Sequence, residues 1–157
     1  MTTYTARPID PVVLKELRSA DDAGRRMVPG TDEEGGAPLR CCLRRARPGE
    51  RIALVAYAPL RRWAAETGAD PGAYEEVGPV FVHAEECGGP AADSGYPFAG
   101  AHRVLRRYSA EGRILGGELV DAVDDEAFRN AFDDPSVALV HVRAVEYGCF
   151  LYEARRC

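Results

Sequence analysis

The sequence predicts an α+β fold in which a mainly antiparallel sheet of about six strands carries roughly two or three peripheral helices. Apolar runs of strand length recur along the chain, short turns join most of them, and no strand–helix–strand series typical of a doubly wound fold is present. The chain has 157 residues, of which 46% are hydrophobic, which is enough for one compact core. We therefore expect a single domain over residues 1–157.

The N-terminal half predicts two helices, a loop and two strands. Asp10 can cap a helix that has Pro11 at its first position and that we expect to end at Gly24. The run VPGTDEEGGAP, residues 28–38, has too few apolar side chains to bury and predicts a mobile loop. The apolar runs IALVAYAPL and GPVFVHAE predict buried strands, and LRRWAAETG between them predicts a helix closed by its glycine.

The C-terminal half predicts two hairpins with a helix between them. HRVLRRYSAEGRILGGELV is typical of two strands around a turn, and DDEAFRNAFDD of a helix that starts with acidic residues. SVALVHVRAVEYGCFLYEARR is the clearest hairpin in the chain. A three-residue loop with Gly148 left-handed would pair His141 with Glu153 and Val145 with Cys149, whereas a two-residue loop would put His141 and Cys149 on opposite faces.

Composition excludes several classes of function. The formal net charge of −5 argues against binding to a phosphate backbone, so we expect no nucleic-acid partner. No run of about eighteen apolar residues and no signal-peptide pattern is present, so we expect no membrane association and a cytoplasmic location. Five cysteines without an export signal predict reduced thiols. Two clusters of arginines, one around residues 40–51 and one at 103–107, predict a solvated face, with an anion site as the alternative.

The segment VFVHAEECGGP gathers reactive groups where a buried strand should end. Strand alternation places His83, Glu85 and Cys87 on one face, with neighbours about 6 to 7 Å apart. This spacing predicts a catalytic site in which His83 or Glu85 is the acid or base and Cys87 supplies a thiol. The alternative is that these residues are structural. In that case His83 has all its hydrogen bonds made at the end of a sheet, Glu85 is solvated and Cys87 is a small packed residue.

Other residues are candidates for substrate or metal binding. Arg143 is a candidate anion clamp, and Tyr57 and His141 are candidate substrate-binding residues. The candidate zinc or iron ligands, which come from separated segments, are Cys42, His83, Cys87 and Cys149. Adjacent Cys41 and Cys42 on an extended chain would point in opposite directions, so we expect only one of them to face a site. His141 and Cys149 would lie roughly 13 Å apart in the three-residue-loop register, too far to share an ion. No nucleotide cofactor motif is present.

Three segments together resemble the bacterial proteins known as domain of unknown function 1203. They are LRCCLRRARPGERIALVAY, GPVFVHAEEC and ALVHVRAVEYGCF, and the likeness covers most of Leu39 to Glu153. The resemblance implies a single small domain and supplies no agreed reaction. The positions that it marks, without assigning them a role, are Cys42, His83, Glu85, Cys87, His141, Arg143 and Cys149.

These observations favour three classes of function. The leading hypothesis is a small cytoplasmic enzyme of secondary metabolism that acts on an anionic small molecule by acid/base or thiol chemistry. The first alternative is a non-catalytic module that binds a ligand or a second copy of the chain as a homo-oligomer. The second alternative is a metalloprotein with cysteine and histidine ligands.

Overall fold

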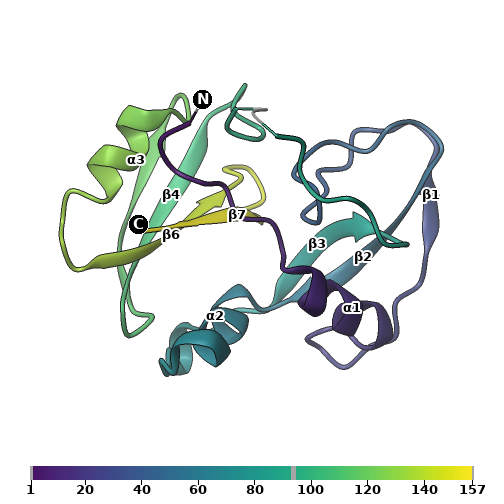
Figure 1. Cartoon of the computed structure of the whole chain (residues 1–157), viewed down its shortest axis with the longest axis horizontal. Helices are drawn as coiled ribbons and strands as arrows, with labels where there is room; N and C mark the ends of the chain where they lie inside the picture. The colour runs from purple at the N-terminus through teal and green to yellow at the C-terminus, as the bar shows by residue number, and fades with distance from the viewer. Residues whose placement is uncertain (1, 93–94, 157) are drawn as a thin grey trace.

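The computed structural model describes residues 2–92 and 95–156 and contains two antiparallel sheets (Figure 1). One sheet has the order β1-β2-β3, formed by β1 (Gly30–Asp32), β2 (Glu50–Tyr57) and β3 (Gly78–His83). The other has the order β5-β4-β6-β7, formed by β4 (Arg103–Ser109), β5 (Ile114–Val120), β6 (Val137–Arg143) and β7 (Phe150–Arg155). The predicted α+β class is confirmed, and the expected single sheet is divided into two.

The described residues form three α-helices, α1 (Pro11–Ser19), α2 (Pro59–Thr67) and α3 (Asp125–Ala131), and a short 3₁₀ helix at Gly72–Tyr74. The carboxylate of Asp10 caps α1 by accepting the backbone N–H of Val12 at 2.8 Å, as predicted. The helix ends at Ser19 rather than Gly24. The Asp21 carboxylate accepts hydrogen bonds from the N–H groups of Ala23 and Arg25, which stabilises a turn there.

Part of the segment predicted as a loop is a strand. Residues Gly30–Asp32 form β1, and Gly30 pairs with Ile52 on β2. Gly30 and Thr31 are exposed and Asp32 is half-buried, so backbone hydrogen bonds hold this strand and apolar patterning does not reveal it. The mobility of residues 28–38 stays a prediction.

The last hairpin follows the three-residue-loop register over most of its length. His141 pairs with Glu153, and Gly148 is left-handed with φ of 71°. A bulge between Val142 and Arg143 then shifts the register, so that the N–H of Ala144 bonds to Cys149 O at 2.9 Å. The expected pairing of Val145 with Cys149 is therefore wrong.

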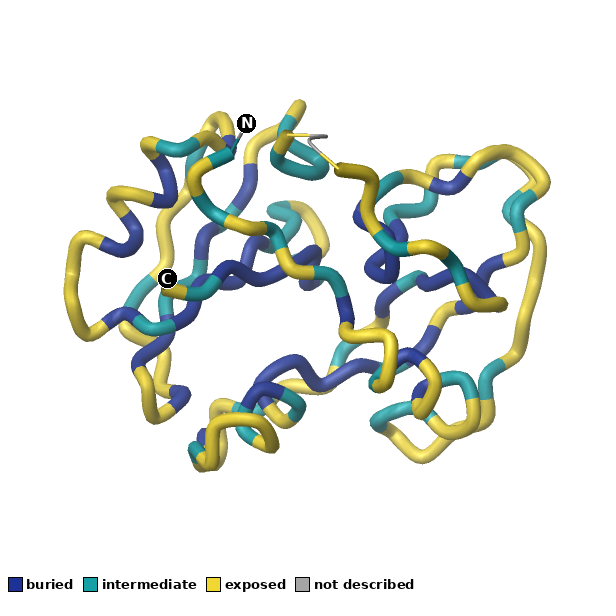
Figure 2. Tube along the Cα trace, viewed as in Figure 1, coloured by how far each residue is buried: buried dark blue, intermediate teal, exposed yellow. Residues whose placement is uncertain are grey.

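Each sheet has its own apolar core. Leu14 and Leu17 of α1 pack on the smaller sheet, and Phe128 of α3 packs on the larger one. A third cluster places Trp63 of α2 against Tyr108 and Leu139 of the larger sheet. In Figure 2 the buried stretches follow the central strands, while the outer loops are exposed.

The N-terminal segment connects the two sheets, as the purple trace in Figure 1 shows. Arg7 N–H donates to Glu153 O on β7 at 2.8 Å, and Ile9 N–H donates to Arg40 O at 3.0 Å. This segment thus holds the turn that contains Arg40 close to β7. Within the described part of the chain, no helix has both the length and the apolar character needed to cross a bilayer.

Candidate metal centre

A compact turn brings Cys41 and Cys42 together. Leu39 N–H bonds to Arg44 O and Leu43 N–H bonds to Leu39 O, both at 2.9 Å, and Leu43 adopts a left-handed φ of 56°. The chain is therefore not extended here. The two sulfur atoms lie 3.9 Å apart and face the same site, so the expectation that only one of them would do so is wrong.

The end of β3 supplies the histidine of the site. β3 ends at His83, which pairs with Ile52 on β2, so the strand alternation expected to continue to Cys87 stops there. The backbone instead turns, and the Arg18 guanidinium of α1 donates to the carbonyls of His83 and Glu85. This turn brings Cys87 back toward His83.

Four ligand atoms converge at this place. The Sγ atoms of Cys41, Cys42 and Cys87 and a ring nitrogen of His83 all lie within 4.8 Å of one another. His83 Nδ1 is 3.4 Å from Cys41 Sγ and 3.8 Å from Cys42 Sγ. A tetrahedral zinc ion with ordinary bond lengths separates two sulfur ligands by about 3.8 Å and a sulfur from a nitrogen ligand by about 3.6 Å. The three measured distances, 3.9, 3.4 and 3.8 Å, match these edges.

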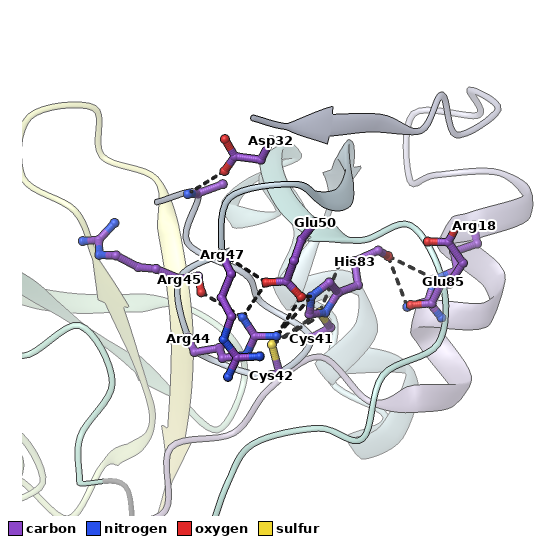
Figure 3. Close-up of polar contacts among 11 residues, drawn as sticks. Arg18, Asp32, Cys41, Cys42, Arg44, Arg45, Arg47, Glu50, His83 and Glu85 are labelled. Carbon is purple, nitrogen blue, oxygen red and sulfur yellow. Dashed lines mark hydrogen bonds and ion pairs between the residues drawn. The ribbon is translucent and has the colours of Figure 1, made fainter. Parts of the chain in front are cut away.

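A carboxylate fixes the orientation of the histidine. Glu50 Oε2 lies 2.9 Å from His83 Nε2 (Figure 3). Arg44 binds both oxygens of Glu50, at 2.7 and 2.9 Å, and together with the Arg47 N–H it holds the pKa of Glu50 well below its usual range. An ionised carboxylate can only accept a hydrogen, so Nε2 carries the proton and, in the neutral ring, Nδ1 presents its lone pair to the sulfurs.

The electrostatics of the two adjacent thiols favour one thiolate. The hydrogen bond between them lowers the pKa of Cys42 and raises that of Cys41, and burial raises the pKa of Cys41 further. The backbone N–H of Arg44 and the charge of its guanidinium also lower the pKa of Cys42. Cys42 is therefore the thiol that this site ionises first, and a thiolate is the form that binds metals.

The predicted catalytic residues separate in the structure. His83 and Cys87 belong to the cluster, but Glu85 is exposed, pairs with Arg51 at 2.9 Å and points away from the cluster in Figure 3. The candidate metal ligands also separate, because Cys149 lines a different cavity. Cys41, which was not among the predicted ligands, belongs to the cluster instead of Cys149.

The predicted substrate-binding residues lie away from the cluster. Tyr57 and Arg143 line the same cavity as Cys149. His141 is fully buried beside it, between the rings of Tyr108 and Phe150, at centroid distances of 4.6 and 4.9 Å. Among residues 2–92 and 95–156, neither ring nitrogen of His141 has a hydrogen-bond partner.

The comparisons with known proteins agree with the resemblance seen in the sequence. Residues 36–156 match the family model described as Protein of unknown function (DUF1203). This range contains Leu39 to Glu153 and therefore the whole cluster of three cysteines and one histidine. No curated protein and no solved structure matches the chain. Because the family model covers most of its length, the chain belongs to the DUF1203 family.

Proposed function

We propose that this protein binds one transition-metal ion, most readily Zn²⁺, through Cys41, Cys42, His83 and Cys87. The observation that carries the proposal is the convergence of four ligand atoms within 4.8 Å, at the edge of the apolar core of the smaller sheet. Three thiols and one imidazole are a common zinc ligand set, and thiolate-rich sites favour soft or borderline ions over Mg²⁺ and Ca²⁺.

The surroundings of the cluster support a metal site in two further ways. Glu50 bonds to the histidine nitrogen that faces away from the sulfurs, which is the usual arrangement behind a metal-binding histidine. A cavity of about 600 Å³ reaches Cys41 and Cys87 past Lys15 and Arg18 and supplies an entry path for the ion.

The bound ion would join three segments that are otherwise held by weaker contacts. These are the turn with the two adjacent cysteines, the end of β3, and the loop that contains Cys87. An ion that binds the folded state alone stabilises it by mass action. Four protein ligands complete a tetrahedral shell, and such closed sites are typically structural or ion-storing.

The geometry supports metal binding better than acid/base catalysis by the predicted residues. Glu85 is engaged by Arg51 on the surface, and His83 is oriented by Glu50 with its free nitrogen directed at sulfur. A general base needs an open path from its lone pair to a substrate proton. In this cluster the thiols of Cys41 and Cys42 lie in front of the Nδ1 lone pair of His83 and block that path.

The test is elemental analysis of tag-free protein purified with reductant and without chelators, followed by Co²⁺ substitution. We expect close to one equivalent of zinc per chain. We also expect the cobalt form to show thiolate-to-metal absorption with the band pattern of a tetrahedral ion.

Two variants and one matched control identify the ligands. Cys87→Ser, at a partly exposed loop position, and Cys41→Ser, in the core, should each lower zinc affinity by at least about tenfold. Cys149→Ser also removes one thiol but lies outside the cluster, so it should retain the full equivalent. Absence of zinc, iron and cobalt binding in well-folded wild-type protein would overturn the proposal, as would equal losses in Cys149→Ser and Cys87→Ser.

A further inference from the structure

A second cavity, of about 130 Å³, lies between the loop of the last hairpin and the start of β3. It is separate from the cavity that reaches the cysteine cluster, and no residue lines both. Its lining includes Tyr57, Glu76, Gly78, Arg143, Gly148 and Phe150. The volume has room for about four water molecules, so a ligand of similar size fits it.

Positive charge exceeds negative charge around this cavity. Arg143 and Arg106, with side chains only 12% and 25% exposed, both pair with Glu76, at 3.3 and 2.6 Å. Glu76 is half-exposed at the rim and is a single carboxylate against two guanidinium groups. Buried charges are usually paired, so this excess favours an anion in the cavity.

A third arginine adds to the excess. Arg40 is buried, and its Nε donates to Phe150 O at 2.8 Å. Within residues 2–92 and 95–156 it has no ion pair with a carboxylate, only bonds to backbone carbonyls. His141, packed against Phe150, does not change this charge balance, because burial keeps its pKa well below the usual value and the ring is therefore neutral.

Arg143 has donors available for a ligand. Its Nε donates to Gly148 O at 2.9 Å and its Nη2 to Glu76 at 3.3 Å, which fixes the plane of the guanidinium. Its Nη1 has no hydrogen-bond partner among the described residues. A guanidinium held in one plane is suited to the planar carboxylate group.

Another part of the cavity wall is apolar. The Tyr57 and Phe150 rings lie 5.7 Å apart, and Pro79 and Val80 also line the cavity. A fully polar anion such as phosphate would lose its hydration against this wall without replacement. A short carboxylate presents oxygens at one end and methyl or methylene groups at the other, which matches both walls.

We propose that this cavity binds a small carboxylate anion, held by Arg143 with its short apolar end against Tyr57 and Phe150. The site is independent of the proposed metal centre, because it shares no lining residue with it. For a ligand of about four to five non-hydrogen atoms, we expect a Kd of about 1 mM or weaker.

The experiment is an NMR titration of ¹⁵N-labelled wild-type protein with sodium acetate, sodium propionate and sodium phosphate at constant ionic strength. We expect saturable shifts at residues 147–150 with acetate and propionate, and no saturation with phosphate over the same range. Arg143→Met should weaken binding by at least about tenfold, because it removes a charged hydrogen-bond donor. Arg129→Met, which changes an exposed arginine on α3, should bind as wild type does.

A second variant keeps the charge and fills the space. A Cβ added at Gly78 meets nothing within 4 Å, so Gly78→Val should fold normally while it occupies part of the cavity. It should also weaken acetate binding by at least about tenfold, which decides the question if Arg143→Met is unstable. Lack of saturable acetate and propionate shifts in wild type, tighter binding of phosphate, or wild-type affinity in Gly78→Val would each overturn the proposal. Zinc content is unaffected in every one of these outcomes, so they are distinguishable from failure of the metal site.

Discussion

Replacing the buried histidine by leucine should remove a specific part of the acid sensitivity of the protein. His141 is fully buried, and neither ring nitrogen is hydrogen-bonded to any residue in the described part of the chain. Burial lowers the pKa of His141 well below its usual value of 6.5, and the charges of Arg143, Arg106 and Arg155 lower it further. The folded state therefore holds this ring neutral at pH values where the unfolded chain protonates it.

The sign and size of the effect follow from proton linkage. Below about pH 6.5 the unfolded state binds one more proton at this residue than the folded state, so stability falls as the pH falls. Each pH unit costs about 1.4 kcal/mol until the pH reaches the lowered pKa of the folded state. Above pH 7 the ring is neutral in both states, and the effect is absent.

A neighbouring carboxyl also contributes to the pH dependence of stability, and the comparison between variants removes its contribution. Glu153, the cross-strand partner of His141, is buried with its pKa raised, so its protonation favours the folded state at low pH and opposes the histidine effect. Both wild type and His141→Leu contain this carboxyl. The difference between their pH profiles therefore reports His141.

The assay is urea unfolding of metal-free protein between about pH 7.5 and pH 5, with free energies obtained by linear extrapolation. At pH 7.5, His141→Leu should be at least as stable as wild type, since it removes two unpaired buried nitrogens. Its loss of stability toward pH 5 should be smaller than that of wild type by about 1.4 kcal/mol per pH unit below pH 6.5. Identical slopes for wild type and His141→Leu would refute the reasoning.

Three further predictions concern the candidate metal centre and the fold. Glu50→Gln should weaken zinc binding by about 10- to 100-fold in competition with a chromophoric chelator, and unchanged affinity would show that the carboxylate does not orient the histidine. Glu85→Gln should change the free energy of unfolding by less than about 0.5 kcal/mol, because its ion pair with Arg51 is exposed on both sides; a loss of zinc in this variant would contradict the geometry. Gly112→Ala should destabilise the protein by about 1–3 kcal/mol in thermal unfolding, since φ is +85° and the added Cβ would lie 2.8 Å from Pro71 Cβ; a wild-type Tm would contradict this.

Turn signals and apolar runs were sufficient to predict most elements of the fold. The hairpin of β4 and β5 and the left-handed Gly68 after α2 lie where the sequence placed them. The division into two sheets was not predictable, because periodicity shows that a strand is buried but not which strand it pairs with. β4 pairs with β6, although β5 and α3 lie between them in the sequence, and no local sequence pattern predicts this pairing.

The candidate site was predictable in part, for a similar reason. His83, Cys42 and Cys87 were recognised by residue type, and the structure brings them together. Cys41 was missed because its position depends on the left-handed backbone of Leu43, a conformation that non-glycine residues seldom adopt and that no sequence pattern indicates. The adjacent pair of cysteines was the one available signal, and an extended chain was the wrong assumption about it.

The arginine groups show a role that charge alone did not predict. A solvated face was expected, yet Arg40 and Arg103 of these clusters are buried and donate to the backbone carbonyls of Phe150 and Phe98. Arg18 and Arg143, which lie outside the two clusters, also donate to backbone carbonyls. Arg18 holds the carbonyls of His83 and Glu85, and Arg143 holds that of Gly148. A guanidinium has five donors, so one side chain can satisfy carbonyls that lie outside any strand ladder.

Arg40 connects the two candidate sites through this kind of bond. It precedes the adjacent cysteines in the turn, and its guanidinium reaches Phe150 O, at the start of β7 and in the wall of the anion cavity. Removing this buried charged donor would leave the Phe150 carbonyl without its Arg40 partner, at a cost of about 1–3 kcal/mol. One buried hydrogen bond therefore stabilises the packing of the turn with the two cysteines against the start of β7, although the two candidate sites share no lining residue.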